Sequence, residues 1–250
     1  MAFWPQNLTQ AKAPPGSEEV RARYASLFAR FGAAPAAMDF SPGQLGPIAG
    51  EWVGAVGSGP ERTMLYFHGG GFVAGAPETH RPLVGRLVEA SGVGAFSVKY
   101  RLAPECFFPS AVRDGIDCYR ALLAKGVRGS SIVLAGDEAG GGLAFAVALA
   151  VRNAGLEMPG GIVALSPWAD LSLSGLSMLS NRKSDTQLDW ETLFLSALVL
   201  VARLDAHETD WIDRLSWPVA ACALFYAQRG VYAQTARLMH ARVLPRQQKI

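Results

Sequence analysis

The chain has 250 residues, of which 50% are hydrophobic and 18% are charged, so it is long enough for one sizeable domain with a filled core. Its 27 glycines and 15 prolines follow no triplet period, and the composition excludes collagen-like, coiled-coil and fully disordered chains. With 23 basic and 21 acidic residues the net charge is +2, which gives no case for a nucleic-acid partner.

Cysteine usage and apolar runs bear on the compartment. The three cysteines are widely spaced and include no CxxC pair, so the sequence predicts neither a disulfide framework nor a metal site. Residues 1–5 contain no basic segment followed by an apolar run, which argues against a secretory signal. The longest apolar stretch, Leu193–Ala202, is too short to span a bilayer. We therefore expect a cytoplasmic protein without a membrane span.

In chain order, the first expected element is an amphipathic helix from about Glu18 to Phe31, with Ser17 as its N-cap. The apolar face of this helix would hold Val20, Tyr24, Leu27, Phe28 and Phe31. A connector rich in Gly, Ala and Pro follows to about Gly50. We expect residues 1–46 to form an N-terminal cap segment and residues 47–250 to form the core.

The middle of the chain alternates strands with helices. Strands are expected at 51–56, 63–67, 95–98, 132–135 and 162–165, and helices at 82–90, 110–124 and 139–154. This alternation is typical of βαβ units, which need right-handed crossovers. The sequence therefore predicts an α/β fold with a mostly parallel central sheet and helices on both faces.

A glycine-rich loop, Phe67-His68-Gly69-Gly70-Gly71-Phe72, directly follows one of these strands. Consecutive glycines let the chain turn sharply and aim backbone N–H groups into an open cavity. Such preorganised donors can stabilise a developing oxyanion. A flexible surface loop is the alternative, and a lone glycine triplet would favour it.

A second glycine-rich turn, Gly136-Asp137-Glu138-Ala139-Gly140, joins a strand to a helix. Its small residues permit a tight turn that lifts the side chain of residue 138 above the sheet, beside the N–H groups that open the helix. A phosphate cradle is the alternative for such a turn, but neither GxGxxG nor GxxxxGK[ST] fits these residues.

A third motif, Tyr100-Arg101-Leu102-Ala103-Pro104-Glu105, lies after the strand at 95–98. Prolines at 104 and 109 stop regular structure there. We expect an ion pair between Arg101 and Glu105 to fix this loop, in a structural role.

The three motifs together resemble the bacterial hormone-sensitive-lipase-like esterases, the branch of the α/β-hydrolases that carries an HGGG motif. The resemblance extends from about Thr63 to Ser172 and includes Ser-Pro-Trp-Ala-Asp-Leu at 166–171. It implies an α/β-hydrolase core with an N-terminal helical cap, hydrolysis of small carboxylic esters, a small ester or carboxylic ligand, and no cofactor. By position, it implies an oxyanion hole formed by Gly70, Gly71 and the N–H of Ala139, in a loop oriented by His68.

Glu138 departs from the family, because it stands where the nucleophilic serine is expected. Hydrolysis through an acyl-serine needs a hydroxyl that a base can deprotonate. Attack by the Glu138 carboxylate would give an anhydride, and its extra methylene misplaces the oxygen relative to the aspartate that some α/β-hydrolases use. We expect no nucleophilic function here. A charged carboxylate beside a helix N-terminus and amide donors is favoured, so Glu138 would fill the oxyanion hole like a bound product acid.

The rest of the triad is not recognisable. Beyond about Ala197 the family pattern is lost, and residues 197–250 look divergent, helical and basic, with six positive charges and no acidic residue after Asp213. An acid could come from only four positions, Asp205, Glu208, Asp210 and Asp213, because the family places its acid before the histidine. His240 is the positional candidate for the base, although its surroundings resemble an ordinary helix. We expect His80 to be exposed or structural, and His207 to be no part of a metal site.

Three functions remain open from the sequence. The first is an esterase-type hydrolase by descent that is impaired or inactive. The second is a noncatalytic homologue that binds a small carboxylic or apolar ligand in the same pocket. The third is a basic C-terminal surface for an anionic partner, which solvated helix faces explain more simply. Apolar C-terminal helices could also pair between chains, which leaves a homodimer open.

Overall fold

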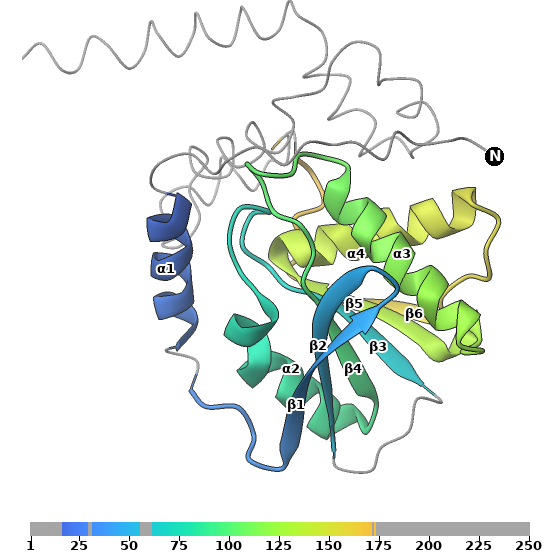
Figure 1. Ribbon diagram of the computed structural model, residues 1–250, viewed down its shortest axis with the longest axis horizontal. Helices are drawn as coiled ribbons and strands as arrows, with labels where there is room; N and C mark the ends of the chain where they lie inside the picture. Colours follow the sequence, from blue (N-terminus) through green and yellow to red (C-terminus); the bar gives the residue numbers. More distant parts are fainter. Residues whose placement is uncertain (1–16, 30–31, 56–61, 172, 174–250) are drawn as a thin grey trace, which may run out of the picture.

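The computed structural model describes residues 17–29, 32–55, 62–171 and 173. Within this part, a central sheet carries helices on both faces (Figure 1). Predictions for Phe31, His207, His240 and the segment 197–250 lie outside the described residues.

The described sheet has six strands in the order β1-β2-β4-β3-β5-β6. They are β1 (Met38–Leu45), β2 (Ile48–Ala55), β3 (Thr63–Phe67), β4 (Gly94–Val98), β5 (Ile132–Asp137) and β6 (Gly161–Leu165). β2 is antiparallel to β1 and β4, whereas β4, β3, β5 and β6 run parallel to one another. The predicted α/β class and mostly parallel sheet are confirmed.

The helices match the predicted helical segments closely. They are α1 (Ser17–Phe28), α2 (Pro77–Ser91), α3 (Ser110–Ala124) and α4 (Glu138–Asn153), with a short 3-10 helix at Gly129–Ser131. The bounds of α3 agree with the sequence prediction, and α2 begins five residues earlier than predicted. α2 starts with Pro77, a residue that suits the first turn of a helix because its missing N–H needs no partner there.

Alternating side chains of the central strands form two cores. Met64 and Tyr66 of β3 pack with the buried face of α2, while Leu65 and Phe67 point to the opposite face, against α3 and α4. Successive residues of a strand point to opposite sides, so a strand covered on both faces is apolar throughout. All five residues of β3 are buried accordingly.

Two expectations for the N-terminal part were wrong. Residues 38–45, assigned to the connector, form β1, which pairs with β2 in a hairpin; the division of the chain at residue 46 stays a prediction. In α1, Val20 is 52% exposed although the helical periodicity placed it on the apolar face. The hydrophobic pattern predicted the helix correctly, but it did not predict which face of the helix packs against the rest of the protein.

Candidate active site

The two glycine-rich turns meet at the carboxyl ends of neighbouring strands. β3 and β5 are parallel neighbours, and Phe67 pairs with Gly136 at the end of their register. The segments that follow β3 and β5 therefore leave the sheet at the same edge. Ligands of open α/β sheets bind at this edge.

Glu138 is the first residue of α4 and has a φ of 49°. This left-handed conformation costs an ordinary residue about 1–2 kcal/mol, so the turn holds Glu138 in a strained position. The turn is so tight that a Cβ on Gly140 would clash with the carbonyl oxygen of Phe67. In this conformation the Glu138 side chain reaches the glycine loop, where its Oε2 accepts from the Gly70 amide.

The Glu138 carboxylate accepts hydrogen bonds from two amides of the glycine loop. Its Oε2 lies 2.6 Å from the Gly70 nitrogen and 3.3 Å from the Gly71 nitrogen. Both glycines are buried and have positive φ values of 117° and 61°, which only glycine adopts readily. Ala139, the third residue expected to contribute an amide, lies in the first turn of α4 and is fully buried. The Gly70 and Gly71 amides thus face the Glu138 carboxylate, and the assignment of Gly70, Gly71 and Ala139 to an oxyanion hole stays a prediction.

Asp137 holds the neighbouring amide, and sequence analysis assigned it no part in the site. Its Oδ1 accepts hydrogen bonds from the Tyr66 hydroxyl at 2.6 Å and from the Gly69 amide at 3.0 Å. Its Oδ2 lies 3.4 Å from His80 Nε2. Burial alone would raise the pKa of Asp137, but His80, Tyr66 and the Gly69 amide outweigh it and lower the pKa below its ordinary value.

His68 is buried inside the glycine loop. Its Nδ1 lies 2.7 Å from the carbonyl oxygen of Gly69, and its ring stacks on Tyr100 with the centroids 4.3 Å apart. The Tyr100 hydroxyl donates to the carbonyl oxygen of His68 at 2.7 Å. Burial, with a smaller contribution from His80, lowers the pKa of His68 to about 3, so its ring is neutral near pH 7. These contacts support a loop-orienting role for His68, which stays a prediction.

His80 is fully buried, which excludes the exposed alternative and leaves the structural one. Its ring packs against Phe28 of α1 at 4.4 Å and lies 5.4 Å from the ring of His68. The α1 helix covers it, a long-range contact that helical periodicity in α2 alone does not reveal.

The expected ion pair between Arg101 and Glu105 was also wrong. Glu105 instead accepts two hydrogen bonds from Arg21 of α1, at 2.8 and 2.7 Å, and these hydrogen bonds hold the pKa of Glu105 below its ordinary value. Arg101 pairs with Asp114 of α3, which is fully buried. The Arg21 guanidinium also donates to the carbonyl oxygens of Val73 and Ala103. Helix α1 is therefore hydrogen-bonded to the end of the glycine-rich loop and to the loop at 100–105.

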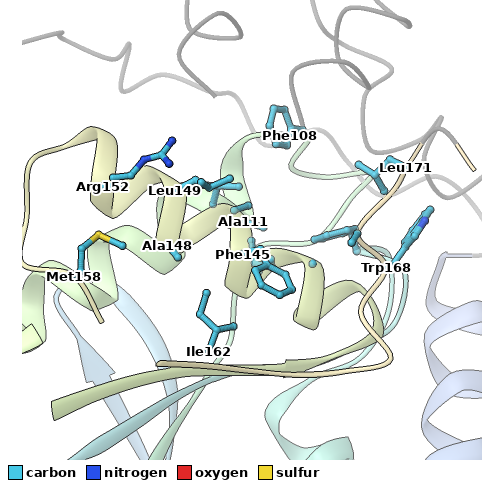
Figure 2. A pocket seen from close by; sticks show the side chains of 16 residues that line it. Phe108, Ala111, Phe145, Ala148, Leu149, Arg152, Met158, Ile162, Trp168 and Leu171 are labelled. Carbon is cyan, nitrogen blue, oxygen red and sulfur yellow. The ribbon is translucent and has the colours of Figure 1, made fainter. Parts of the chain in front are cut away.

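An apolar cavity of about 520 Å³ lies beside these turns, over the outer side of α4 (Figure 2). Figure 2 shows Trp168 and Leu171 at one end and Arg152 and Met158 at the other. Phe72, next to the glycine triplet, also lines it. The Trp168 amide donates to the backbone carbonyl oxygen of Glu138 at 2.7 Å, which connects the cavity wall to the strained turn.

Comparison with known proteins decides the family. Residues 64–238, well over half of the chain, match the alpha/beta hydrolase fold family. The chain belongs to the α/β-hydrolase fold family.

Two curated relatives of this α/β-hydrolase are an acetyl-hydrolase and an esterase. The chain is similar to an acetyl-hydrolase of Streptomyces hygroscopicus, with 41% identity over 145 residues that cover 58% of this chain and 48% of that protein. An esterase of Acinetobacter venetianus is 35% identical over 152 residues, 61% of this chain and 50% of that protein. The chain thus spans about half the length of these curated relatives.

Among solved structures, an esterase from the bacterial hormone-sensitive lipase family is 31% identical with a TM-score of 0.74, covering 87% of this chain and 69% of that chain. This agrees with the predicted resemblance to hormone-sensitive-lipase-like esterases, which is confirmed. The family match continues to residue 238, although the pattern could be followed in the sequence only to about 197.

The described part of the α/β-hydrolase also bears on metal binding, membrane spans and the candidate base. Residues 17–29, 32–55, 62–171 and 173 hold no group of three or more His, Cys, Asp or Glu side chains that could bind a metal. No helix in these ranges is long and apolar enough to cross a membrane. His240, the candidate base, lies outside both these ranges and the family match.

Proposed function

We propose that this chain derives from a carboxylic-ester hydrolase and that Glu138 fills its oxyanion hole, which leaves it impaired or inactive toward esters. The hydrogen bonds from Gly70 and Gly71 to the Glu138 carboxylate are the observation that carries this proposal. The family membership supports the ester chemistry.

The proposal follows from what an oxyanion hole must do. Its donors have to be free, and about 2.7–3.1 Å from the oxygen that becomes negative in the transition state. Here the Gly70 amide is already bound at 2.6 Å by a carboxylate oxygen. A second negative oxygen would be repelled by that carboxylate, and residue 138 supplies no hydroxyl that could form an acyl intermediate. The site resembles one with a bound product acid, with the carboxylate built into the chain.

Ester turnover by a Glu138→Ser variant tests the proposal. Hydrolysis of p-nitrophenyl acetate and p-nitrophenyl octanoate is measured for the parent, for Glu138→Ser, and for Glu138→Ala as the matched control. Glu138→Ala frees the amides without supplying a nucleophile. We expect turnover from the serine variant only. Equal activity in the parent and in the serine variant would refute the filled-hole explanation.

An inactive serine variant would leave the triad partners in question, so the open hole needs its own measurement. We expect acetate to stabilise Glu138→Ala against thermal unfolding, because a small carboxylate can replace the missing side chain. If acetate does not stabilise Glu138→Ala, the Gly70 and Gly71 amides do not form an open anion site. This conclusion does not depend on which residues serve as the acid and the base of the triad.

A second candidate function, noncatalytic binding of a small apolar or carboxylic ligand, is favoured by the cavity of about 520 Å³ and its nearly apolar described lining. Octanoate and octanol should then raise the melting temperature of the parent without any ester turnover. Ala146→Phe, which fills the cavity wall from α4, should remove that effect. An unchanged response in this variant would place the ligand elsewhere.

We further propose that the ligand is a small ester or carboxylic acid and not a nucleic acid, and that the protein is cytoplasmic. The buried free thiols of Cys106 and Cys118 are consistent with a reducing compartment. Sedimentation velocity tests the open question of a homodimer, and salt-dependent association would be required for a basic interaction surface.

A further inference from the structure

Three successive amides of the glycine loop are bound by two successive carboxylates. The Gly69 amide donates to Asp137, and the Gly70 and Gly71 amides donate to Glu138. The proposed function concerns Glu138 alone. Asp137 lies one residue earlier, at the end of β5, and would hold the first amide whatever residue stood at 138.

The Asp137 carboxylate is bound from three separate elements. Tyr66 belongs to β3, Gly69 to the glycine loop and His80 to α2. Tyr66 and His80 are fully buried, and 15% of the Asp137 side chain is exposed. Hydrogen bonds to a charged acceptor in such surroundings are stronger than those between neutral groups.

The ring of His80 presents Nε2 to Asp137. Its Nδ1 lies 2.8 Å from Thr79 Oγ1 and 3.2 Å from the Ala76 carbonyl oxygen, which leaves Nε2 to face the carboxylate. The Thr79 hydroxyl itself donates to the Ala76 carbonyl oxygen at 2.8 Å. Helix α2 thereby places a buried histidine ring 3.4 Å from the second oxygen of Asp137, while the Tyr66 hydroxyl donates to the first.

The glycine loop closes directly onto this carboxylate. A Cβ on Gly69 would lie 2.6 Å from Asp137 Oδ2, so no side chain fits between them. On its other side the loop is tied by its own turn, in which the Val73 and Ala74 amides donate to the Gly70 carbonyl oxygen. The Gly69 amide is therefore the point where the loop is joined to the end of β5.

The geometry points to Asp137 as a positioning residue: its carboxylate, held by Tyr66 and His80, fixes the Gly69 amide so that the next two amides face the side chain at 138. Its catalytic meaning rests on the proposed function, because those two amides would be the oxyanion hole. The lowered pKa of Asp137 agrees with a carboxylate that stays charged in this role. An esterase with serine at 138 would need this anchor more, since no carboxylate at 138 would hold its amides.

Amide hydrogen exchange of Gly69 tests this inference. The sequence contains His followed by Gly only at 68–69, so labelling histidine with ¹³C at the carbonyl and glycine with ¹⁵N isolates the Gly69 amide signal. In Asp137→Asn the acceptor loses its charge but keeps its size. We expect Gly69 exchange to accelerate about tenfold and its proton signal to move upfield. Unchanged exchange and shift in this variant would overturn the inference.

Glu51→Gln is the matched control. Glu51 is a buried carboxylate paired with Arg81, the residue after His80 in α2, but it does not touch the glycine loop. We expect a stability loss without a change at Gly69. Equal effects of both variants on Gly69 would mean that any weakening of α2 disturbs the loop, and would overturn a specific role for Asp137.

Two measurements hold even if Asp137→Asn does not fold. Tyr66→Phe removes one donor from Oδ1 and leaves the charge, so Gly69 must stay protected, with its signal at or downfield of the parent position. In the parent, the Gly69 amide must exchange far more slowly than a free peptide. Fast exchange in either protein would overturn the anchor. None of these readouts depends on ester turnover, so an inactive Glu138→Ser variant would overturn the proposed function alone.

Discussion

Removing the Glu138 carboxylate should destabilise the fold and create a binding site for a small anion. In Glu138→Ala the Gly70 and Gly71 amides lose their acceptor. A hydrogen bond to a charged group contributes about 1.5–3 kcal/mol. The 3.3 Å contact is weak and Glu138 is only partly buried, so the expected loss in unfolding free energy is about 2 kcal/mol. For a chain of this size, that lowers the melting temperature by about 4–8 °C.

Acetate should reverse part of this loss, because its carboxylate can take the place of the missing side chain. At ten times its dissociation constant, a ligand that binds only the folded state adds about 1.4 kcal/mol. The assay is thermal unfolding of parent and variant at pH 7 over a series of acetate concentrations, with matched sodium chloride as the control for ionic strength. Acetate must stabilise the variant and leave the parent unchanged. An alanine variant as stable as the parent, or equal stabilisation of both, would refute the reasoning.

Three further predictions concern the strained turn, acid sensitivity and the docking of α1. Glu138→Gly should be about 1 kcal/mol more stable than Glu138→Ala in urea unfolding, since glycine accepts a φ of 49° without strain; equal stability would contradict a strained turn. The pKa of His68 is lowered to about 3, so between about pH 6.5 and 3 only the unfolded chain takes up that proton. The unfolding free energy should therefore decrease by up to about 1.4 kcal/mol per pH unit as the pH falls through this range, and a pH-independent urea midpoint would contradict this. A double-mutant cycle on Arg21→Gln and Glu105→Gln should give a coupling of about 1–2 kcal/mol, because the pair is bidentate and about one quarter exposed; additive effects would contradict the clamp.

The arrangement of the two glycine turns could be predicted from the sequence because it follows from local pattern. Each turn comes directly after an apolar strand, and neighbouring parallel strands end at the same edge of a sheet. This is sufficient to place residue 138 beside Gly70 and Gly71 once the strands pair as β3 and β5 do. The residues alone do not show which strands pair, and the expected pairing of these two strands came from the family resemblance.

What could not be predicted depends on contacts between distant segments. β1 contains Pro42 and Gly43, residues that argue against a strand, but it is an edge strand of the described sheet and tolerates them. Glu105 pairs with Arg21, which is 84 positions away, because Arg101 is captured by Asp114. Sequence proximity favours the wrong partner where four charged side chains can pair in more than one way.

The role of Asp137 could not be predicted for a related reason. Its position beside Glu138 draws attention to a strand-to-helix turn, where a carboxylate can be read as a helix cap. The structure gives no side-chain cap bond to Asp137 and directs its carboxylate to Gly69, Tyr66 and His80 instead. Only the docking of α2 brings the third of these groups into place.

An electron-density map of the parent at pH 7 tests the central claim most directly. We expect a Glu138 oxygen within hydrogen-bonding distance of the Gly70 and Gly71 nitrogens, with no solvent between them. A water molecule on those two amides, with the carboxylate turned away toward α1, would contradict it.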